Sequence, residues 1–219
     1  MDQRVLFSEK RGNSAQTTKV SGEFCRVSLR LFRNDWLERL TYMPLSVFIP
    51  VWVVIFSLVC LDCMPMAVAP FVALFLMGLI FWSFFEYLGH RFLFHLDLSH
   101  EIGKRFIFLI HGNHHDEPGE KLRNMMPLSV SLPLAGLLWA LAHFLGGHSG
   151  TTFFLGFLAG YIVYDLVHYA CHQYRPKRGI LRKLRRHHLI HHYAAPEKNF
   201  AVSNDVWDRI FHTKTGRSP

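Results

Sequence analysis

Ten histidines of this 219-residue chain fall into four short clusters whose chemistry suits metal binding. The clusters read "HRFLFH", "HGNHH", "HYACH" and "HLIHH". The nitrogen of a neutral imidazole is a common ligand for iron, zinc and copper. Ten ligands are too many for one ion, so the pattern predicts two metal ions with five histidines each. The candidate ligands are His90, His95, His111, His114, His115, His168, His172, His188, His191 and His192.

Three of the clusters have the spacing that places side chains on one face of a helix. Positions i, i+3 and i+4 project to the same side because a turn takes about 3.6 residues. All three histidines of "HGNHH" and of "HLIHH" meet this condition, as do both histidines of "HYACH". The histidines of "HRFLFH" are five residues apart, which fits a helix end that turns into a loop.

Two acidic residues lie where they can support these ligands. A ligating histidine usually donates its other ring N–H to a carboxylate or a carbonyl. Glu86 precedes His90 by four residues, and Asp165 precedes His168 by three, so each lies on the face of its histidine. An acid inside an apolar segment is costly and indicates function. Asp165 is therefore the candidate catalytic residue outside the ligand set, in a supporting role.

The elements that carry these residues are predicted from two segments without basic residues. Half of the chain is hydrophobic, and Lys and Arg are absent from residues 45–84 and 128–171. Each segment is long enough for two membrane crossings of about 20 residues. The first divides at "DCMP" and the second at "GGHSG". The predicted crossings are residues 44–62, 66–85, 127–146 and 151–169.

The basic residues predict the orientation in the membrane. All 24 fall into three blocks, with 8 before the first crossing, 5 between residues 86 and 126, and 11 after residue 172. Four crossings place all three blocks on one face, and the positive-inside tendency makes that face cytoplasmic. Both termini are then cytoplasmic. This distribution also argues that the net charge of +8 does not serve nucleic-acid binding.

The remaining segments complete the predicted organisation. Residues 1–26 are expected to form a flexible polar tail without a cleavable signal peptide. Residues 27–219 form the membrane-embedded domain, in which residues 86–126 and 173–219 build a cytoplasmic cap. The segment "VSLRLFRNDWLERL", residues 27–40, has near-helical apolar spacing and predicts an interfacial helix.

This topology brings the four clusters together. His90 follows the second crossing directly, and His168 lies about 26 Å along a helix from Thr151, at the same membrane boundary. The other two clusters belong to the cap. The predicted fold is an all-α integral membrane protein with four transmembrane helices and a cytoplasmic helical cap that holds a histidine-rich dimetal site. A soluble helical protein with two buried hairpins is the alternative.

Five further histidines are expected to lie outside the site. His143 and His148 fall at the far end of the third crossing, about a membrane thickness away. His187 is outside the helical spacing of its cluster. His100 and His212 are isolated, and we expect them at the surface or supporting the ligands.

Together, "HRFLFH", "HGNHHDEP", "YDLVHYACH" and "HHLIHHY…NFAVSNDVWDRIF" resemble the fatty acid hydroxylase/sterol desaturase superfamily, and within it the fatty acid 2-hydroxylases. The resemblance runs from about residue 29 to residue 213. It implies that the ten histidines ligate two iron ions, which zinc can replace in purified protein. It also implies O2 as co-substrate, because attack on an unactivated C–H bond requires metal chemistry.

The resemblance further implies a membrane lipid or acyl substrate that is hydroxylated at C2. Many fatty acid 2-hydroxylases carry a cytochrome b5 domain with an "HPGG" motif, which is not found in these 219 residues. An external electron donor of the cytochrome b5 or ferredoxin type is therefore expected. The expected location is a bacterial inner membrane or the endoplasmic reticulum. A sterol or carotenoid hydroxylase or a desaturase is the alternative enzyme, and a metal or haem carrier is the alternative outside the enzymes.

Overall fold

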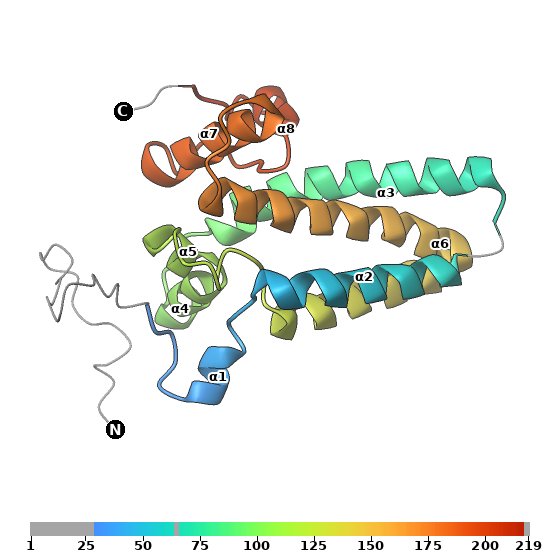
Figure 1. The fold of residues 1–219 in the computed structure, drawn as a ribbon, viewed down its shortest axis with the longest axis horizontal. Helices are drawn as coiled ribbons and strands as arrows, with labels where there is room; N and C mark the ends of the chain where they lie inside the picture. The colour runs from blue at the N-terminus through green and yellow to red at the C-terminus, as the bar shows by residue number, and fades with distance from the viewer. Residues whose placement is uncertain (1–28, 64–65, 217–219) are drawn as a thin grey trace, which may run out of the picture.

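Three long helices form the frame of the molecule. The computed structural model describes residues 29–63 and 66–216, and all regular secondary structure in them is helical, which confirms the predicted all-α class. The frame consists of α2 (Leu45–Asp62), α3 (Val68–Leu88) and α6 (Leu128–Gln173), and α6 packs against the other two. These helices run along the long axis of the molecule (Figure 1). The predicted polar tail lies outside the described residues.

The frame helices have the length and composition of membrane spans. Three segments of the described chain are long and apolar enough to cross a membrane: Leu45–Asp62, Val68–Phe94 and Leu128–Gln173. Only a small part of each segment is buried inside the protein, and many of its large apolar side chains are exposed. An apolar surface of this kind is stable in hydrocarbon rather than in water.

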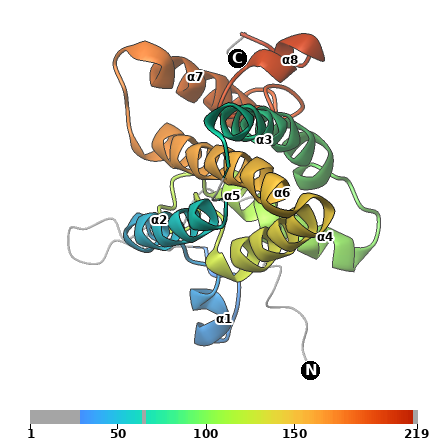
Figure 2. The same cartoon turned by 90° about the vertical axis from the view of Figure 1, so that its right-hand side faces the viewer.

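The helix α6 reverses direction at Gly147. The φ angle of this residue is 55°, in the left-handed region that glycine adopts without steric cost. On either side of it, Nδ1 of His143 and Oγ1 of Thr151 lie 3.0 Å apart. The 46 residues of α6 therefore form a hairpin of two arms, residues 128–146 and 148–173, which lie beside α2 and α3 (Figures 1 and 2).

Glycines bring α3 and the second arm of α6 into close contact. A Cβ on Gly78 would lie 1.9 Å from the carbonyl oxygen of Phe153, and one on Gly156 would lie 1.9 Å from that of Phe75. Small residues permit this approach of two helix backbones in a membrane protein. One turn further along α6, Gly160 leaves room for the ring of Trp82.

The short helices gather at one end of the frame, where α3 and the second arm of α6 end (Figure 1). They form a cap made from segments that are distant in the sequence. The cap contains α1 (Asp35–Arg39), the π-helices η1 (Gly89–Phe94) and η2 (Phe108–Gly112), α4 (Glu101–Ile107), α5 (Asn113–Asp116), α7 (Gly179–Tyr193) and α8 (Val206–Ile210).

The helix predicted over residues 27–40 is wrong in extent, because only Asp35–Arg39 is helical and residues 29–32 are not. Glu38 turns inward, where its carboxylate accepts the backbone N–H groups of Leu31 and Phe32 and pairs with Arg123. Those N–H groups are thus bonded to a side chain rather than to a helix. Residues 27 and 28 lie outside the described residues.

Candidate metal centre

The ten predicted histidines converge in the cap as two groups of five. In each group, one ring nitrogen from every residue lies within 4.8 Å of the others. The groups are neighbours, since the rings of His115 and His192 stack with centroids 4.2 Å apart. The first histidine group is His90, His95, His111, His115 and His191, and the second is His114, His168, His172, His188 and His192.

Helix geometry explains how each cluster divides between the groups. The i,i+4 pair of "HGNHH" joins the first group, and its middle histidine, His114, joins the second. In "HLIHH" the i,i+4 pair joins the second group, and His191 joins the first. One helical face therefore serves two neighbouring sites.

The irregular pair in "HRFLFH" is explained by π-helix. A π-helix bonds residues five apart, so His90 in η1 and His95 at its end come onto one side. Their ring centroids are 5.1 Å apart.

The ring Nε2 atoms point into each group. In the first group, Nε2 of His111 lies 3.1 Å from that of His90 and 2.9 Å from that of His115. In the second group, Nε2 of His188 lies 2.8 Å from that of His172 and 3.0 Å from that of His192.

Backbone carbonyls on the outside determine which nitrogen carries the proton in three of the rings. A carbonyl oxygen can only accept, so the Nδ1 atom beside it must donate. The Nε2 atom of the neutral ring then presents a lone pair to its group. The three pairs are His90 Nδ1 with Phe200 O at 2.5 Å, His191 Nδ1 with Lys198 O at 2.7 Å, and His168 Nδ1 with Asn124 O at 2.7 Å.

This arrangement fits a bound cation in each group. Lone pairs that converge at these distances repel one another unless a positive charge lies between them. In the second group, the buried Nε2 atoms of His114 and His168 have no hydrogen-bond partner among the described residues. Five imidazoles without a carboxylate are a donor set for a transition metal rather than for calcium or magnesium.

Burial keeps the histidines in the form that binds metal. It lowers the pKa of His95 and of His115 to about 4 and, together with the neighbouring histidines, the pKa of His191 to about 3. The pKa values of His111, His114 and His188 are lowered well below the usual value for the same reason. These rings are therefore neutral near pH 7, and a metal ion need not displace a proton from them.

The carbonyls beside the first group are held in place by two buried carboxylates. Glu86, 5% exposed, accepts the backbone N–H groups of Val202 and Ser203 at 2.7 and 2.8 Å. Asp208, fully buried, accepts those of Phe200 and Ala201, both at 2.9 Å. Glu86 lies one turn from His90, as its spacing indicated, but it acts on the backbone rather than on the ring.

Asp165 has an equivalent position near the second group. It is 2% exposed, and its Oδ2 atom accepts the backbone N–H of Met126 at 3.2 Å. The ring of His168 bonds to the carbonyl of Asn124, two residues earlier, and not to Asp165. Asp165 thus contacts the segment that orients a candidate ligand, and its role in the reaction stays a prediction.

Asp208 and Asn124 are residues that sequence reasoning missed. Asp208 lies in the quoted "NDVWDRIF" but belongs to no histidine cluster. It also bonds to Nε2 of His187 at 2.9 Å. Asn124 has no acidic or basic group to mark it. The group that contacts the ring of His168 is the backbone carbonyl of Asn124. Every residue type has a backbone carbonyl, so the residue type gives no signal for this contact.

The other histidines lie outside both groups. His143 and His148 are at the far end of the frame, where Nδ1 of His148 bonds to the carbonyl of Asp62 at 2.6 Å. His100 and His212 are exposed.

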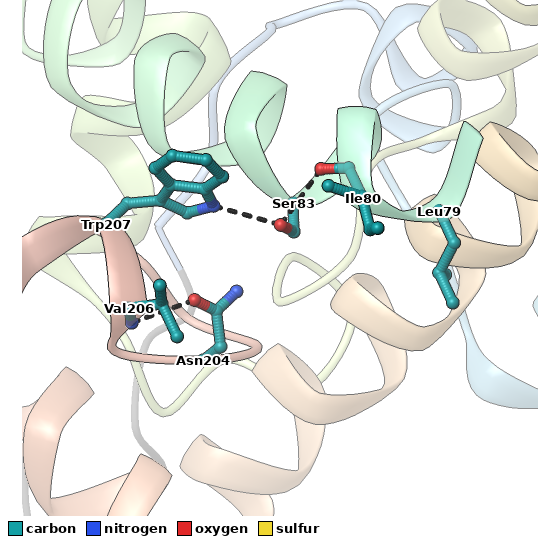
Figure 3. Close-up of a pocket in the computed structure, with 6 residues that line it drawn as sticks. All are labelled: Leu79, Ile80, Ser83, Asn204, Val206 and Trp207. Carbon is teal, nitrogen blue, oxygen red and sulfur yellow. Dashed lines mark hydrogen bonds between the residues drawn. The ribbon is translucent and has the colours of Figure 1, made fainter. Parts of the chain in front are cut away.

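An apolar groove lies on the surface between α3 and α8 (Figure 3). Its volume is 490 Å³, and it is lined by Leu79, Ile80, Ser83, Asn204, Val206 and Trp207. The polar atoms of its lining are already bonded to one another: Trp207 donates to Ser83 at 2.9 Å, and Asn204 accepts from the backbone of Val206 at 3.0 Å. The groove therefore offers a mainly apolar surface to a ligand. None of its lining residues is one of the ten histidines.

The helical frame and the histidine groups together define the class of protein: a helical protein with apolar segments long enough to span a membrane and two groups of candidate metal ligands. The sequence profile of the fatty acid hydroxylase family matches residues 75–213, and the chain belongs to this family. The matched region contains all ten histidines and both supporting carboxylates of the first group.

Named relatives lie within the fatty acid 2-hydroxylases. The dihydroceramide fatty acyl 2-hydroxylase FAH1 of Arabidopsis thaliana is 32% identical over 187 residues, which cover 84% of this chain and 79% of the relative. The human fatty acid 2-hydroxylase is 37% identical over 153 residues, 68% of this chain and 41% of the relative. The ceramide very long chain fatty acid hydroxylase scs7 of Schizosaccharomyces pombe is 35% identical over 199 residues, 85% of this chain and 55% of the relative.

A solved structure is also similar. It is that of full-length scs7p, in which only the hydroxylase domain is visible, with a TM-score of 0.79 and 33% sequence identity. The similarity covers 86% of this chain and 73% of that one. The fold and the family thus agree, while the chain spans only about half the length of several relatives.

Proposed function

We propose that this protein is a membrane-bound, O2-dependent hydroxylase that inserts a hydroxyl group at C2 of a fatty acyl chain, with two iron ions bound by the ten histidines. The observation that carries the proposal is the pair of five-histidine groups, in which the Nε2 lone pairs of His90, His168 and His191 are directed inward. The names of the relatives support 2-hydroxylation of an acyl lipid over sterol or carotenoid oxidation or desaturation.

The iron ions would supply the activation of O2 that no side chain can provide. The chain's own part is to hold five neutral imidazoles around each ion and to fix their orientation from outside. The carbonyls of residues 124, 198 and 200 do this for three rings. Four residues of the set, His95, His115, His172 and His192, are half-buried, and the other six are buried.

We further propose that α2, α3 and the two arms of α6 are four membrane crossings. The first arm of α6, residues 128–146, is about 28 Å long at 1.5 Å per residue, close to the thickness of the hydrocarbon core. The basic residues outside these segments support a cytoplasmic location for the cap and the metal centre. The membrane would be a bacterial inner membrane or the endoplasmic reticulum.

The substrate would be a membrane lipid whose acyl tail lies among the apolar helices. Its carboxyl-derived end would then reach the centre in the cap, which accounts for oxidation close to that end. The apolar groove supports an acyl ligand at this depth, because Ser83 in its lining precedes His90 by seven residues, about 10 Å along α3 and the start of η1. Electrons would come from a donor of the cytochrome b5 or ferredoxin type.

Lipid analysis of expressing cells tests the proposal. Total lipids are hydrolysed and 2-hydroxy fatty acids are measured in cells with the parent chain, with a His111→Ala, His115→Ala variant, and with His100→Ala as a control. A rise in the parent and in the His100→Ala control, but not in the double variant, supports a 2-hydroxylase. Oxidised acyl chains with a double bond or a hydroxyl elsewhere would contradict it.

A further inference from the structure

We infer that two separate backbone clamps support the two histidine groups, so that the metal ion of either group can be lost while the other is retained. The inference rests on the proposed pair of metal sites and goes beyond it by assigning positioning roles to residues that bind no metal. Outer residues of this kind typically affect metal affinity about 10- to 100-fold.

The C-terminal clamp consists of residues 198–203 with Glu86 and Asp208. Two carbonyls of this segment, those of Lys198 and Phe200, accept from rings of the first group alone. Four consecutive N–H groups, from residue 200 to residue 203, end on the two carboxylates. The segment therefore has little freedom to shift without breaking charge-assisted hydrogen bonds.

The central clamp consists of the segment around Asn124 with Asp165 and Gln173. The carbonyl of Asn124 accepts from His168, a member of the second group. Its side-chain amide donates to the carbonyl of Pro118 at 2.9 Å and accepts from Gln173. Two residues after Asn124, the backbone N–H of Met126 donates to the carboxylate of Asp165. Asn124 is only 1% exposed, so water cannot replace these bonds.

The clamps reach the centre from different parts of the chain. The C-terminal clamp is the connection between α7 and α8, whereas the central clamp lies between α5 and α6. Helices α5 and α7 carry ligands of both groups and must stay in place for either ion. Each clamp, by contrast, contacts the rings of one group alone, as do the ligand-bearing ends of η1 and α6.

Two isosteric substitutions separate the clamps. Asp208 accepts four donors, from Phe200, Ala201, Thr213 and His187, so Asp208→Asn sets an amide N–H against another donor. Asn124→Asp sets a carboxylate oxygen against the carbonyl of Pro118. Each change preserves volume and leaves every histidine in the chain.

The test is a metal count and a chelator competition on full-length protein in detergent, stripped and reloaded with Zn²⁺. The parent should bind two ions. Asp208→Asn should retain one ion at its original affinity and bind the other about 10- to 100-fold more weakly, and Asn124→Asp should do the same for the other ion. Adding His172→Ala to Asp208→Asn should then abolish tight binding, whereas adding His95→Ala should remove only the weak ion. With Asn124→Asp the two histidine substitutions should exchange their effects.

The inference is overturned if both clamp variants weaken both ions equally, weaken neither, or weaken the ion of the opposite group. If either variant fails to fold, Ser203→Ala and Gln173→Leu provide milder changes. The first removes the hydrogen bonds of Ser203 Oγ with Glu86 and Asn204, and the second removes those of Gln173 with Gly119 and Asn124. Each should then accelerate the release of a single ion to a chelator, and release of both together would contradict the clamps. A parent that binds fewer than two ions would instead refute the proposed metal centre.

Discussion

The Nδ1 atom of His168 lies 2.7 Å from the carbonyl oxygen of Asn124, although 44 residues separate them. The contact joins the C-terminal part of α6 to the segment that follows α5. It also sets the direction in which the Nε2 lone pair of His168 points. Similar contacts orient His90 and His191. In this protein the orientation of candidate ligands thus depends on backbone placement, and the placement depends on buried carboxylates and amides.

Removing one histidine from either group should cost one metal ion. We expect His111→Ala and His188→Ala each to lower the metal content from about two ions per chain to about one, because each ring lies among five converging nitrogens. Elemental analysis of purified protein measures this. His100→Ala, an exposed histidine outside both groups, is the control and should keep both ions. An unchanged metal content in both ligand variants would argue against the site.

The buried ion pair between Glu38 and Arg123 should be important for stability. Their side chains are 6% and 4% exposed, so Glu38→Ala leaves a buried guanidinium without its partner and should cost about 3–5 kcal/mol. Denaturant titration in detergent measures this loss. The double variant Glu38→Leu, Arg123→Met should recover much of it. The matched control is Asp35→Ala, which breaks an exposed pair with Arg30 and should cost less than about 1 kcal/mol. Equal losses for both pairs would contradict the burial argument.

The close contact of α3 and α6 should not tolerate a side chain at Gly156. We expect Gly156→Leu to lower the thermal unfolding temperature strongly or to prevent assembly, because its Cβ would meet the carbonyl of Phe75. Gly136→Leu is the control on the same helix, since nothing lies within 4 Å of a Cβ there. A similar unfolding temperature for the two variants would show that the helices do not pack this closely.

The groove between α3 and α8 should bind an acyl chain. In liposomes that contain a lipid with a photoreactive acyl chain, we expect labelling of both α3 and Val206. Ile80→Trp should fill the groove and reduce labelling at Val206. Leu76 lies one turn away on α3, is also exposed and does not line the groove. Leu76→Trp should therefore leave the labelling of Val206 unchanged. Equal labelling of Val206 in both variants would exclude a chain in the groove.

Much of the architecture could be predicted because its signals are local in the sequence. Apolar segments of helical length indicated an all-α protein, and the described residues confirm this class. The helical spacing of "HGNHH" and "HLIHH" predicted that their histidines project together, but not that each cluster divides between two groups. That division depends on how α5 and α7 approach each other, which no single segment encodes.

The outer contacts could not be predicted for a physical reason. The carbonyl of Asn124 and the carboxylate of Asp208 act through bonds between segments far apart in the chain, and backbone atoms leave no trace in residue type. The five-residue spacing of His90 and His95 fits a helix that ends in a loop, and the chain does leave the helix at His95. What the spacing did not indicate is that the last turn is a π-helix, which brings both rings to the same side.

The most direct test of the proposed hydroxylase is a single turnover of the iron-loaded protein with ¹⁸O2. Purified protein in lipid nanodiscs is reduced chemically, so that no donor protein is required, and is supplied with a ceramide that has a saturated acyl chain. The account predicts a 2-hydroxy acyl product that carries ¹⁸O at C2, and no product from the His111→Ala, His115→Ala variant. A hydroxyl group that carries oxygen from water, or ¹⁸O at any other carbon, would contradict it.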